Sequence, residues 1–261
     1  MKKTLAAATV ALLAGVAGVA NAADMYSPSG GSLKDVPAYV PPPTWTGFYV
    51  GAHVGGAWAD LSNHDVDGYT FNGPNYGWSN NNSGVFGGGT VGYNYQTSAF
   101  VFGVEADFGG AGLTGNWNNG YAATYASGYL WAKDNASFYA DVTGRLGYAA
   151  GPALFYVKGG WAYLDANTKV GGVDVNGNPW SVSTSGLNGW TVGGGVEYLF
   201  APSWSVKAEY LYLDFGSFNT NWVDNNPVNL GYNWQFDHDL YVNTFKVGVN
   251  YHFNNIYNPL K

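Results

Sequence analysis

From residue 45 onward, the chain alternates apolar side chains with small or polar ones at every second position. In the stretch AFVFGVEADFGG (residues 99–110), one face is continuously apolar, while the other carries Glu105 and Asp107. A period of two is that of an extended strand, whose successive side chains point to opposite faces. The segments that show it have about the length that a tilted membrane-spanning strand needs. Helical periodicity is absent here, so the alternation predicts an all-β protein.

Eight segments follow this pattern. They cover residues 46–58, 84–95, 99–110, 136–149, 153–164, 187–200, 203–214 and 240–253. Tight turns are expected at residues 96–98, 150–152 and 201–202, and long connections at residues 59–83, 111–135, 165–186 and 215–239. Short turns at one end and long loops at the other are typical of outer-membrane barrels. We therefore predict an eight-stranded antiparallel up-and-down transmembrane β-barrel with short periplasmic turns and long extracellular loops.

The composition indicates that the apolar faces meet lipid. Charged residues make up 10% of the chain, compared with roughly 25% in ordinary soluble domains. The formal net charge is −7, and no cluster of Lys or Arg exists beyond Lys2 and Lys3, which excludes nucleic-acid binding.

Aromatic residues, 18% of the chain, gather at the ends of the apolar faces. We expect them to form two girdles at the membrane–water interfaces. The expected girdle residues are Trp45, Phe48, Tyr95, Phe100, Tyr148, Phe155, Phe200, Trp204, Tyr251, Trp58, Phe108, Phe138, Tyr163, Trp190, Tyr212 and Tyr241.

The opposite faces carry charged residues of both signs among many glycines. The charged residues are Glu105, Asp107, Asp141, Arg145, Lys158, Glu197, Lys207, Glu209 and Lys246. The interior of an eight-stranded barrel is just wide enough to be filled by side chains, and buried charges must be paired. We therefore predict a lumen ion-pair network, with the inward glycines making room for it.

Two other interpretations of the acids are weaker. Paired carboxylates such as Glu105 and Asp107 occur in enzymes, but here bases of similar depth are available to pair with them. The four histidines are scattered without metal-ligand spacing. Residues 237–239 (Asp-His-Asp) are expected to be a solvated part of the last long connection, although they could bind a cation. No catalytic, cofactor-binding or metal site is predicted.

The pattern of the N-terminus predicts an export signal. Two lysines precede a small, apolar stretch, and Ala20-Asn21-Ala22 fits the cleavage rule. We expect a signal peptide at residues 1–22, a Pro-rich periplasmic segment at 23–44, the outer-membrane barrel at 45–253 and a C-terminal tail at 254–261. The chain has no cysteine, so nothing in it depends on disulfides.

Several motifs resemble those of one family. They are WTGFYVGAHVGGAW (45–58), GGGTVGYNYQ (87–96), FVFGVEADFGG (100–110), TGRLGYA (143–149), GWTVGGGVEY (189–198) and KAEYLYLDFG (207–216). Together they are similar to the small outer-membrane immunogenic barrels of alphaproteobacteria, often described as porin-family, within the OmpA-like superfamily. The resemblance implies an outer-membrane location in a Gram-negative bacterium, envelope integrity, surface antigenicity, sometimes weak pore activity, and no enzyme.

The same resemblance implies outer-membrane lipid, lipopolysaccharide and the barrel-assembly machinery as partners, without a cofactor. Such barrels usually end on an aromatic residue that the machinery recognises. Phe253 would be that assembly signal, but residues 254–261 follow it, which departs from the family's pattern.

The sequence leaves several functions open. The first is a structural barrel that displays surface loops, with its lumen largely plugged by the ion pairs. The second is a narrow porin for small solutes, which the inward glycines favour and the balanced charges oppose. The third is adhesion or host contact through the loops, with an unknown ligand. A lipid-modifying barrel enzyme is disfavoured because no Ser/His/acid set is evident.

Overall fold

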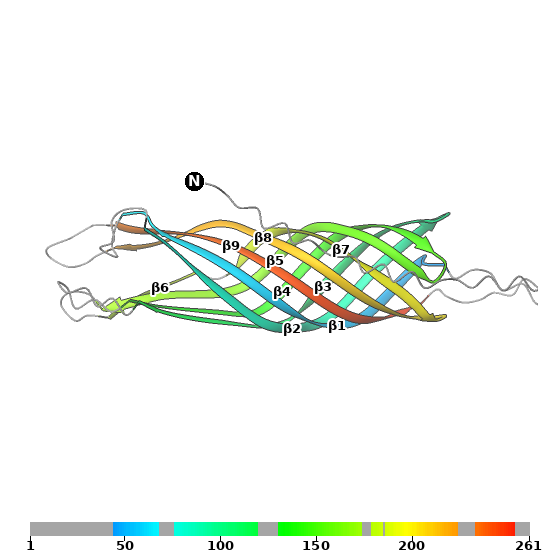
Figure 1. Cartoon of the computed structure of the whole chain (residues 1–261), viewed down its shortest axis with the longest axis horizontal. Helices are drawn as coiled ribbons and strands as arrows, with labels where there is room; N and C mark the ends of the chain where they lie inside the picture. The colour runs from blue at the N-terminus through cyan, green and yellow to red at the C-terminus, as the bar shows by residue number, and fades with distance from the viewer. Residues whose placement is uncertain are drawn as a thin grey trace, which may run out of the picture. The chain divides into compact units, whose positions relative to one another are not determined.

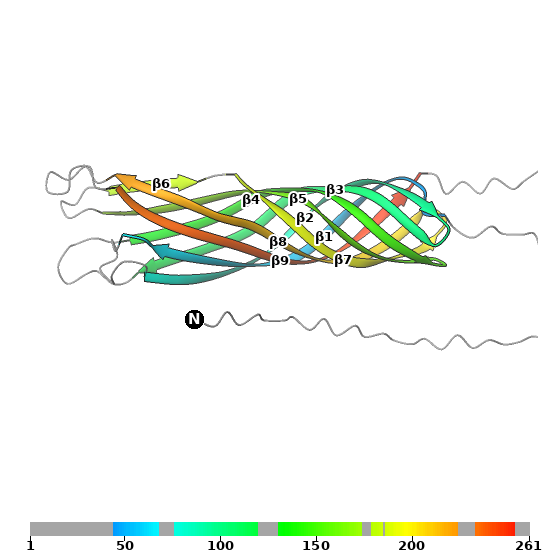
Figure 2. The same cartoon turned by 90° about the horizontal axis from the view of Figure 1, so that it is seen from above.

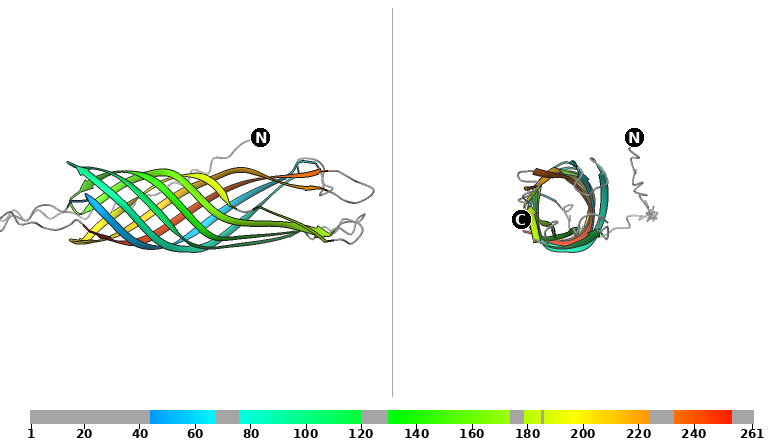
Figure 3. Two further views of the ribbon diagram at one scale, coloured as in Figure 1. Left: turned by 180° about the vertical axis from the view of Figure 1, so that it is seen from behind. Right: turned by 90° about the vertical axis from the view of Figure 1, so that its left-hand side faces the viewer.

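The computed structural model describes residues 44–67, 76–119, 130–173, 179–184, 186–223 and 233–253. Its strands are β1 (Gly47–Asp65), β2 (Tyr76–Thr97), β3 (Phe100–Asn119), β4 (Leu130–Ala150), β5 (Ala153–Val173), β6 (Pro179–Thr184), β7 (Leu187–Ala201), β8 (Trp204–Val223) and β9 (Asn233–His252). All pairings are antiparallel, and β9 pairs back with β1, so the sheet closes into a barrel (Figures 1 and 3). The described residues contain no helix that is long and apolar enough to cross a membrane.

The nine strands occupy eight positions around the barrel, and each position is called a wall below. β5 pairs with β7 through Ala153–Leu164 and with β6 through Thr168–Val173. β6 and β7 therefore follow one another along the same edge of β5 and form a single wall. Gly186 lies at their junction with a φ of +77°, a conformation that glycine adopts without steric cost. The predicted eight-stranded antiparallel transmembrane barrel is confirmed.

The strands continue well beyond the segments that the alternation predicted. β1 runs to Asp65 rather than residue 58, and its last residues pair with both β2 and β9. Parts of all four predicted long connections are strand, so their predicted bounds were wrong (Figure 2). The physical reason is that lipid imposes the apolar alternation only within the bilayer, whereas backbone pairing continues outside it with polar side chains.

The outer wall is apolar and aromatic, as the lipid-facing interpretation requires. Of the expected girdle residues, twelve are exposed: Phe48, Tyr95, Phe100, Tyr148, Phe155, Phe200, Trp204, Tyr251, Trp58, Phe108, Phe138 and Trp190. Tyr163, Tyr212 and Tyr241 are half-buried. Neighbouring girdle rings touch, as Trp204 does with Tyr251 and Tyr212 with Tyr241.

Trp45 is a correction to the predicted girdle. Its side chain is 1% exposed and packs edge-on against His252 inside the barrel. The alternation itself places residue 45 inside, because Trp45 stands four residues before the buried Tyr49, whereas the lipid-facing Phe48 is an odd number of positions away. Trp45 therefore lies inside the short-turn end of the barrel instead of facing lipid.

The interior is arranged in three layers. A base cluster at the short-turn end consists of Trp45, Val101, Leu154, Tyr156 and Leu199. The charged layer of Asp, Glu, Lys and Arg comes next. Beyond it lies an apolar layer that the sequence analysis did not foresee, consisting of Ala57, Ala59, Leu61, Phe86, Ala111, Ala162, Leu164, Ala166, Leu187, Phe215, Leu240 and Val242.

The predicted signal peptide, the Pro-rich segment up to residue 43 and the tail at 254–261 lie outside the described residues. Phe253 follows β9 directly, donates its backbone N–H to the carbonyl of Phe48 and packs against Tyr251. Its role as an assembly signal stays a prediction.

Candidate functional site in the barrel lumen

The structure brings all nine predicted charged residues together inside the barrel, and none is more than 3% exposed. Glu105 and Asp107 come from β3, Asp141 and Arg145 from β4, Lys158 from β5, Glu197 from β7, Lys207 and Glu209 from β8, and Lys246 from β9. They occupy inward positions of the alternation on six of the walls. The stagger of a tilted barrel places these residues at one depth although they are far apart in the chain.

Lys158 lies at the centre of the charged layer. Its Nζ is 2.6 Å from Glu105 Oε1, 2.9 Å from Asp107 Oδ2 and 3.1 Å from Glu209 Oε1. Lys246 contacts Asp107 and lies 2.8 Å from Glu209 Oε1. Lys207 Nζ lies 3.1 Å from Glu105 Oε2, so each of these acids contacts two lysines or more, as buried charges require.

The second basic centre is Arg145. Its guanidinium forms an ion pair with Glu197 and lies 3.7 Å from the centre of the Tyr156 ring. It also donates to the hydroxyl of Tyr49 at 3.2 Å, and Tyr49 in turn donates to Glu105 Oε2 at 2.8 Å. Tyr49 thus links the two halves of the network.

Further residues that the sequence analysis did not single out complete the network. They are Tyr49, His53, Thr90, Tyr139, Tyr156, Ser205, Asn250 and His252. Thr90, for example, donates to Asp107 and contacts a ring nitrogen of His53. All of them stand at inward positions that the simple alternation marks, and Tyr139 does so two residues before the inward Asp141. That position is the signal that could have identified them.

The structure brings a serine, a histidine and an acid together, which the sequence alone did not reveal. Ser205 donates to Glu197 Oε1, and its Oγ lies 2.9 Å from His252 Nε2. In a catalytic triad the acid holds the histidine nitrogen that faces away from the serine. Here Glu197 Oε1 approaches the same Nε2, at 3.4 Å, and Ser205 is fully buried. The set therefore binds the network together rather than presenting a nucleophile.

Two cation-binding arrangements can be examined in the described residues. Oxygens of Glu105, Asp107 and Glu209 lie within 4.8 Å of one another, but the ammonium of Lys158 already lies among them. Asp237 and Asp239 belong to β9 and not to a connection, which corrects the sequence prediction. The buried His238 between them points inward, so the three side chains do not converge.

The inward glycines hold space that other side chains occupy. A Cβ on Gly92 would lie 2.3 Å from the Tyr49 hydroxyl, and one on Gly103 would lie 2.3 Å from Asn94 Oδ1. A Cβ on Gly51 would lie 2.0 Å from Asn250 Oδ1. These glycines let large polar side chains fill the lumen. They therefore narrow the open space inside the barrel and do not widen it.

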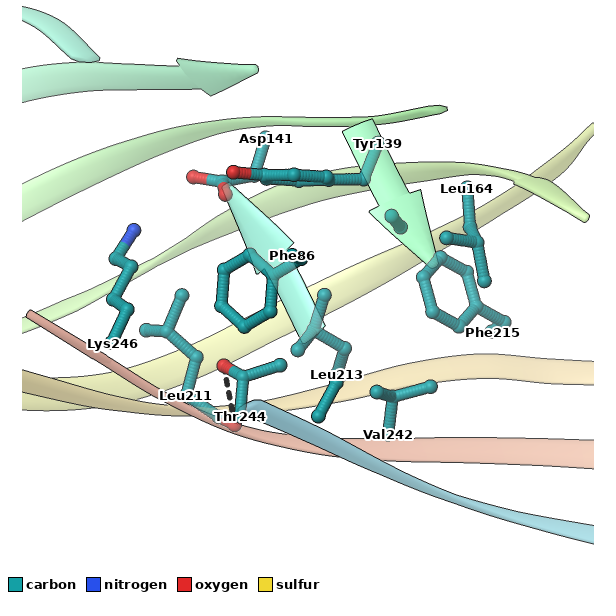
Figure 4. Close-up of a pocket in the computed structure, with 12 residues that line it drawn as sticks. Phe86, Tyr139, Asp141, Leu164, Leu211, Leu213, Phe215, Val242, Thr244 and Lys246 are labelled. Atoms are coloured by element: carbon teal, nitrogen blue, oxygen red, sulfur yellow. Dashed lines mark hydrogen bonds between the residues drawn. The ribbon is translucent and has the colours of Figure 1, made fainter. Parts of the chain in front are cut away.

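A cavity of about 40 Å³ lies where the charged layer meets the apolar layer (Figure 4). Phe86, Leu211, Leu213 and Val242 line it on the apolar side, and Asp141 borders it on the charged side.

An apolar, aromatic outer wall around a charged interior, closed without a free sheet edge between its first and last strands, defines a transmembrane barrel. The chain matches the family model of the outer membrane protein beta-barrel domain over residues 9–236, and it belongs to that family. It is an outer-membrane protein of a Gram-negative bacterium.

Two relatives are similar over most of their length. The 31 kDa outer-membrane immunogenic protein of Brucella melitensis is 33% identical over 217 residues, covering 80% of this chain and 84% of the relative. The 22 kDa outer membrane protein of Rhizobium leguminosarum is 30% identical, covering 75% of this chain and 80% of the relative. The resemblance to alphaproteobacterial outer-membrane immunogenic proteins is confirmed.

Solved structures with a similar fold are more distant. The outer membrane protein OprG of Pseudomonas aeruginosa is 12% identical with a TM-score of 0.46, covering 81% of this chain and 99% of OprG. The attachment invasion locus protein Ail of Yersinia pestis is 15% identical with a TM-score of 0.36, covering 80% of this chain and 99% of Ail.

Proposed function

We propose that the protein is a structural barrel whose lumen is closed, which contributes to envelope integrity and displays antigenic loops. The observation that carries this proposal is the burial of all nine charged side chains to 3% exposure or less. A lumen with a continuous water path would leave several of them solvated. The base cluster and the inward glycines support closure at other depths.

The loop-display part of the proposal rests on the relatives, several of which are named outer-membrane immunogenic proteins. The strand ends at Asp65, Asn119, Val173 and Val223 lie at the end of the barrel opposite the tight turns. In outer-membrane barrels that end faces outward. We therefore infer that the connections beyond these strand ends are the surface antigen, and that the barrel holds them in place.

We also propose that the protein is not an enzyme and needs no cofactor. The buried position of the Ser205–His252–Glu197 set supports this, because no substrate reaches a fully buried serine. The partners that we propose are the surrounding lipid, lipopolysaccharide and the assembly machinery that would recognise Phe253.

Planar-bilayer conductance of the refolded protein tests closure. We expect no reproducible channels from the natural sequence. Arg145→Ala or Lys207→Ala, which remove a large side chain from the charged layer, should increase conductance. Val192→Ala, on the lipid-facing wall, is the matched control and should leave it unchanged. Stable channels from the natural sequence that Arg145→Ala or Lys207→Ala abolishes would instead establish the narrow porin.

A further inference from the structure

The barrel wall between β5 and β8 is incomplete beyond Trp190, on the side of the long connections. β8 pairs with β7 only as far as the pair of Asp214 with Trp190, but it continues along β9 to Val223. β6 stands in the same wall as β7 and pairs with β5, yet no described residue of β6 pairs with β8 (Figure 2). We call the backbone of β8 from Phe215 to Val223, on the side away from β9, the open edge.

A bulge ends the pairing of β8 with β7. The register of β8 against β9 shifts between Asp214 and Ser217, and Gly216 within this bulge has a φ of +65°. Asp214 holds the bulge, because its Oδ1 accepts the backbone N–H of Gly216 at 2.8 Å. A Cβ on Gly216 would meet no described atom within 4 Å. Since bulges terminate pairing where they occur, the open edge is set by the local sequence and has space beside it.

The open edge lacks the residues that usually protect a sheet edge. A row of unpaired N–H and C=O groups is a template for another strand, and proteins block it with lysine, other charges or proline. The residues from Phe215 to Val223 include no charged residue and no proline. The backbone here is therefore suited to β-augmentation, in which an extended peptide adds a strand to a sheet.

The surroundings of the open edge decide which side chains such a strand carries. Asp214 lies on the outer face where the edge begins, and Asp239 of β9 accepts the hydroxyl of Ser217 on the same face. No lysine or arginine occurs in β6, in β8 after Lys207 or in β9 before Lys246. On the inner face, Phe215 and Phe218 belong to the apolar layer or pack against it. An added strand therefore meets acids outside and hydrocarbon inside.

We propose that the open edge of β8 is a docking site for an extended, basic segment of another protein. The segment adds to β8 as an antiparallel strand and forms backbone hydrogen bonds between Phe215 and Val223. Its outward side chains are lysine or arginine and face Asp214 and Asp239, and its inward side chains are apolar. This surface goes beyond the proposed structural function, because it gives the barrel a protein partner on its extracellular side.

Fluorescence anisotropy of a labelled peptide tests the docking, with the full protein in phosphatidylcholine nanodiscs. The probe is a capped peptide of alternating lysine and valine that is as long as β6. It should bind saturably to nanodiscs that hold the protein and not to empty ones. A peptide with glutamate in place of lysine loses the charge complementarity, and one with N-methylated backbone amides loses the hydrogen bonds. Each should bind at least roughly tenfold more weakly.

Hydrogen exchange measured by mass spectrometry locates the bound peptide. The lysine–valine peptide should slow the exchange of the β8 amides from Phe215 to Val223, because an added strand covers the open edge. The amides of β1 from Ala59 to Asp65 lie at the same end of the barrel and already pair on both sides. Their exchange should not change.

Two variants and a second peptide complete the experiment. Asp214→Asn combined with Asp239→Asn keeps both side-chain acceptors and removes two charges, so it should weaken binding roughly three- to tenfold. Asp60→Asn, on the outer face of β1, is the matched control and should leave binding unchanged. A peptide of the β6 sequence, Pro179–Thr184, carries no base and tests a second copy of this chain as the occupant. It should not bind.

The proposal is overturned if the lysine–valine peptide does not bind, or if the glutamate, N-methylated or β6 peptide binds as well as it does. It is equally overturned if the double Asp→Asn variant keeps full affinity, or if the protected amides lie outside β8 and β6.

Discussion

At the scale of single residues, the charged layer makes a strong prediction about stability. Arg145→Leu leaves Glu197 buried without its basic partner and removes the cation that lies over the Tyr156 ring. Breaking a buried pair in this way costs about 3–5 kcal/mol. The free energy of unfolding, measured by urea titration in lipid vesicles, should fall by that amount, and Glu105→Leu should behave similarly. Equal unfolding midpoints for Arg145→Leu and the natural protein would mean that the lumen is wet and its pairs are weak.

A glycine makes the second prediction at this scale. Gly92→Ala places a Cβ 2.3 Å from the Tyr49 hydroxyl and 2.3 Å from its ring carbon, so Tyr49 must move away from Glu105. Overpacking of this kind costs about 1–3 kcal/mol. Gly144→Ala is the matched control, because its Cβ meets nothing closer than 3.9 Å. Urea unfolding should separate the two variants, and adding Tyr49→Ala to Gly92→Ala should remove the clash itself. Equal losses at Gly92 and Gly144 would contradict the packing.

At the scale of elements, the strand extensions beyond the bilayer can be tested by hydrogen exchange. The segment of β1 from Ala59 to Asp65 pairs with β2 and β9, so its amides should be protected. Because this segment lies beyond the lipid, its protection should be weaker than that of Tyr49–Ala57 in the same strand. Mass spectrometry of the nanodisc-bound protein measures both. Exchange of residues 59–65 at the rate of an unstructured peptide would show instead that β1 ends near Trp58.

The elements also show which parts of the structure can be predicted from sequence. Alternation marks the inner and outer faces wherever lipid touches the wall, so it placed Glu105 on the inside and Phe108 on the outside. Beyond Trp58 the outward positions of β1 become polar (Asp60, Ser62, His64), while Ala59 and Leu61 face the apolar layer inside, so the lipid-facing pattern ends before the strand does. That is why the end of β1 was missed. Trp45 was misplaced because it was grouped with the aromatic ends of the outer face, although it stands at an inward position four residues before Tyr49. The Ser205–His252 contact joins two walls, and a pattern within one strand cannot reveal it.

At the scale of the whole molecule, the seam between β1 and β9 decides whether the barrel is closed. Val54 and Val247 are direct partners across this seam, and both side chains face outward. Paired positions in antiparallel strands have Cα separations of about 4.5–5.5 Å, which a disulfide can bridge. Since the chain has no cysteine, Val54→Cys with Val247→Cys introduces the only thiols.

Oxidation of that double variant should lock the first wall to the last and stabilise the fold by about 5 kcal/mol, because the cross-link closes a very long loop of the unfolded chain. The temperature at which the folded band converts to the heated band on a detergent gel should therefore rise on oxidation and return on reduction. Val54→Cys with Val192→Cys is the control, since β7 pairs with β5 and β8 rather than with β1. Cross-linking of the control pair as readily as the seam pair, or no conversion temperature at all, would be incompatible with a barrel closed between β1 and β9.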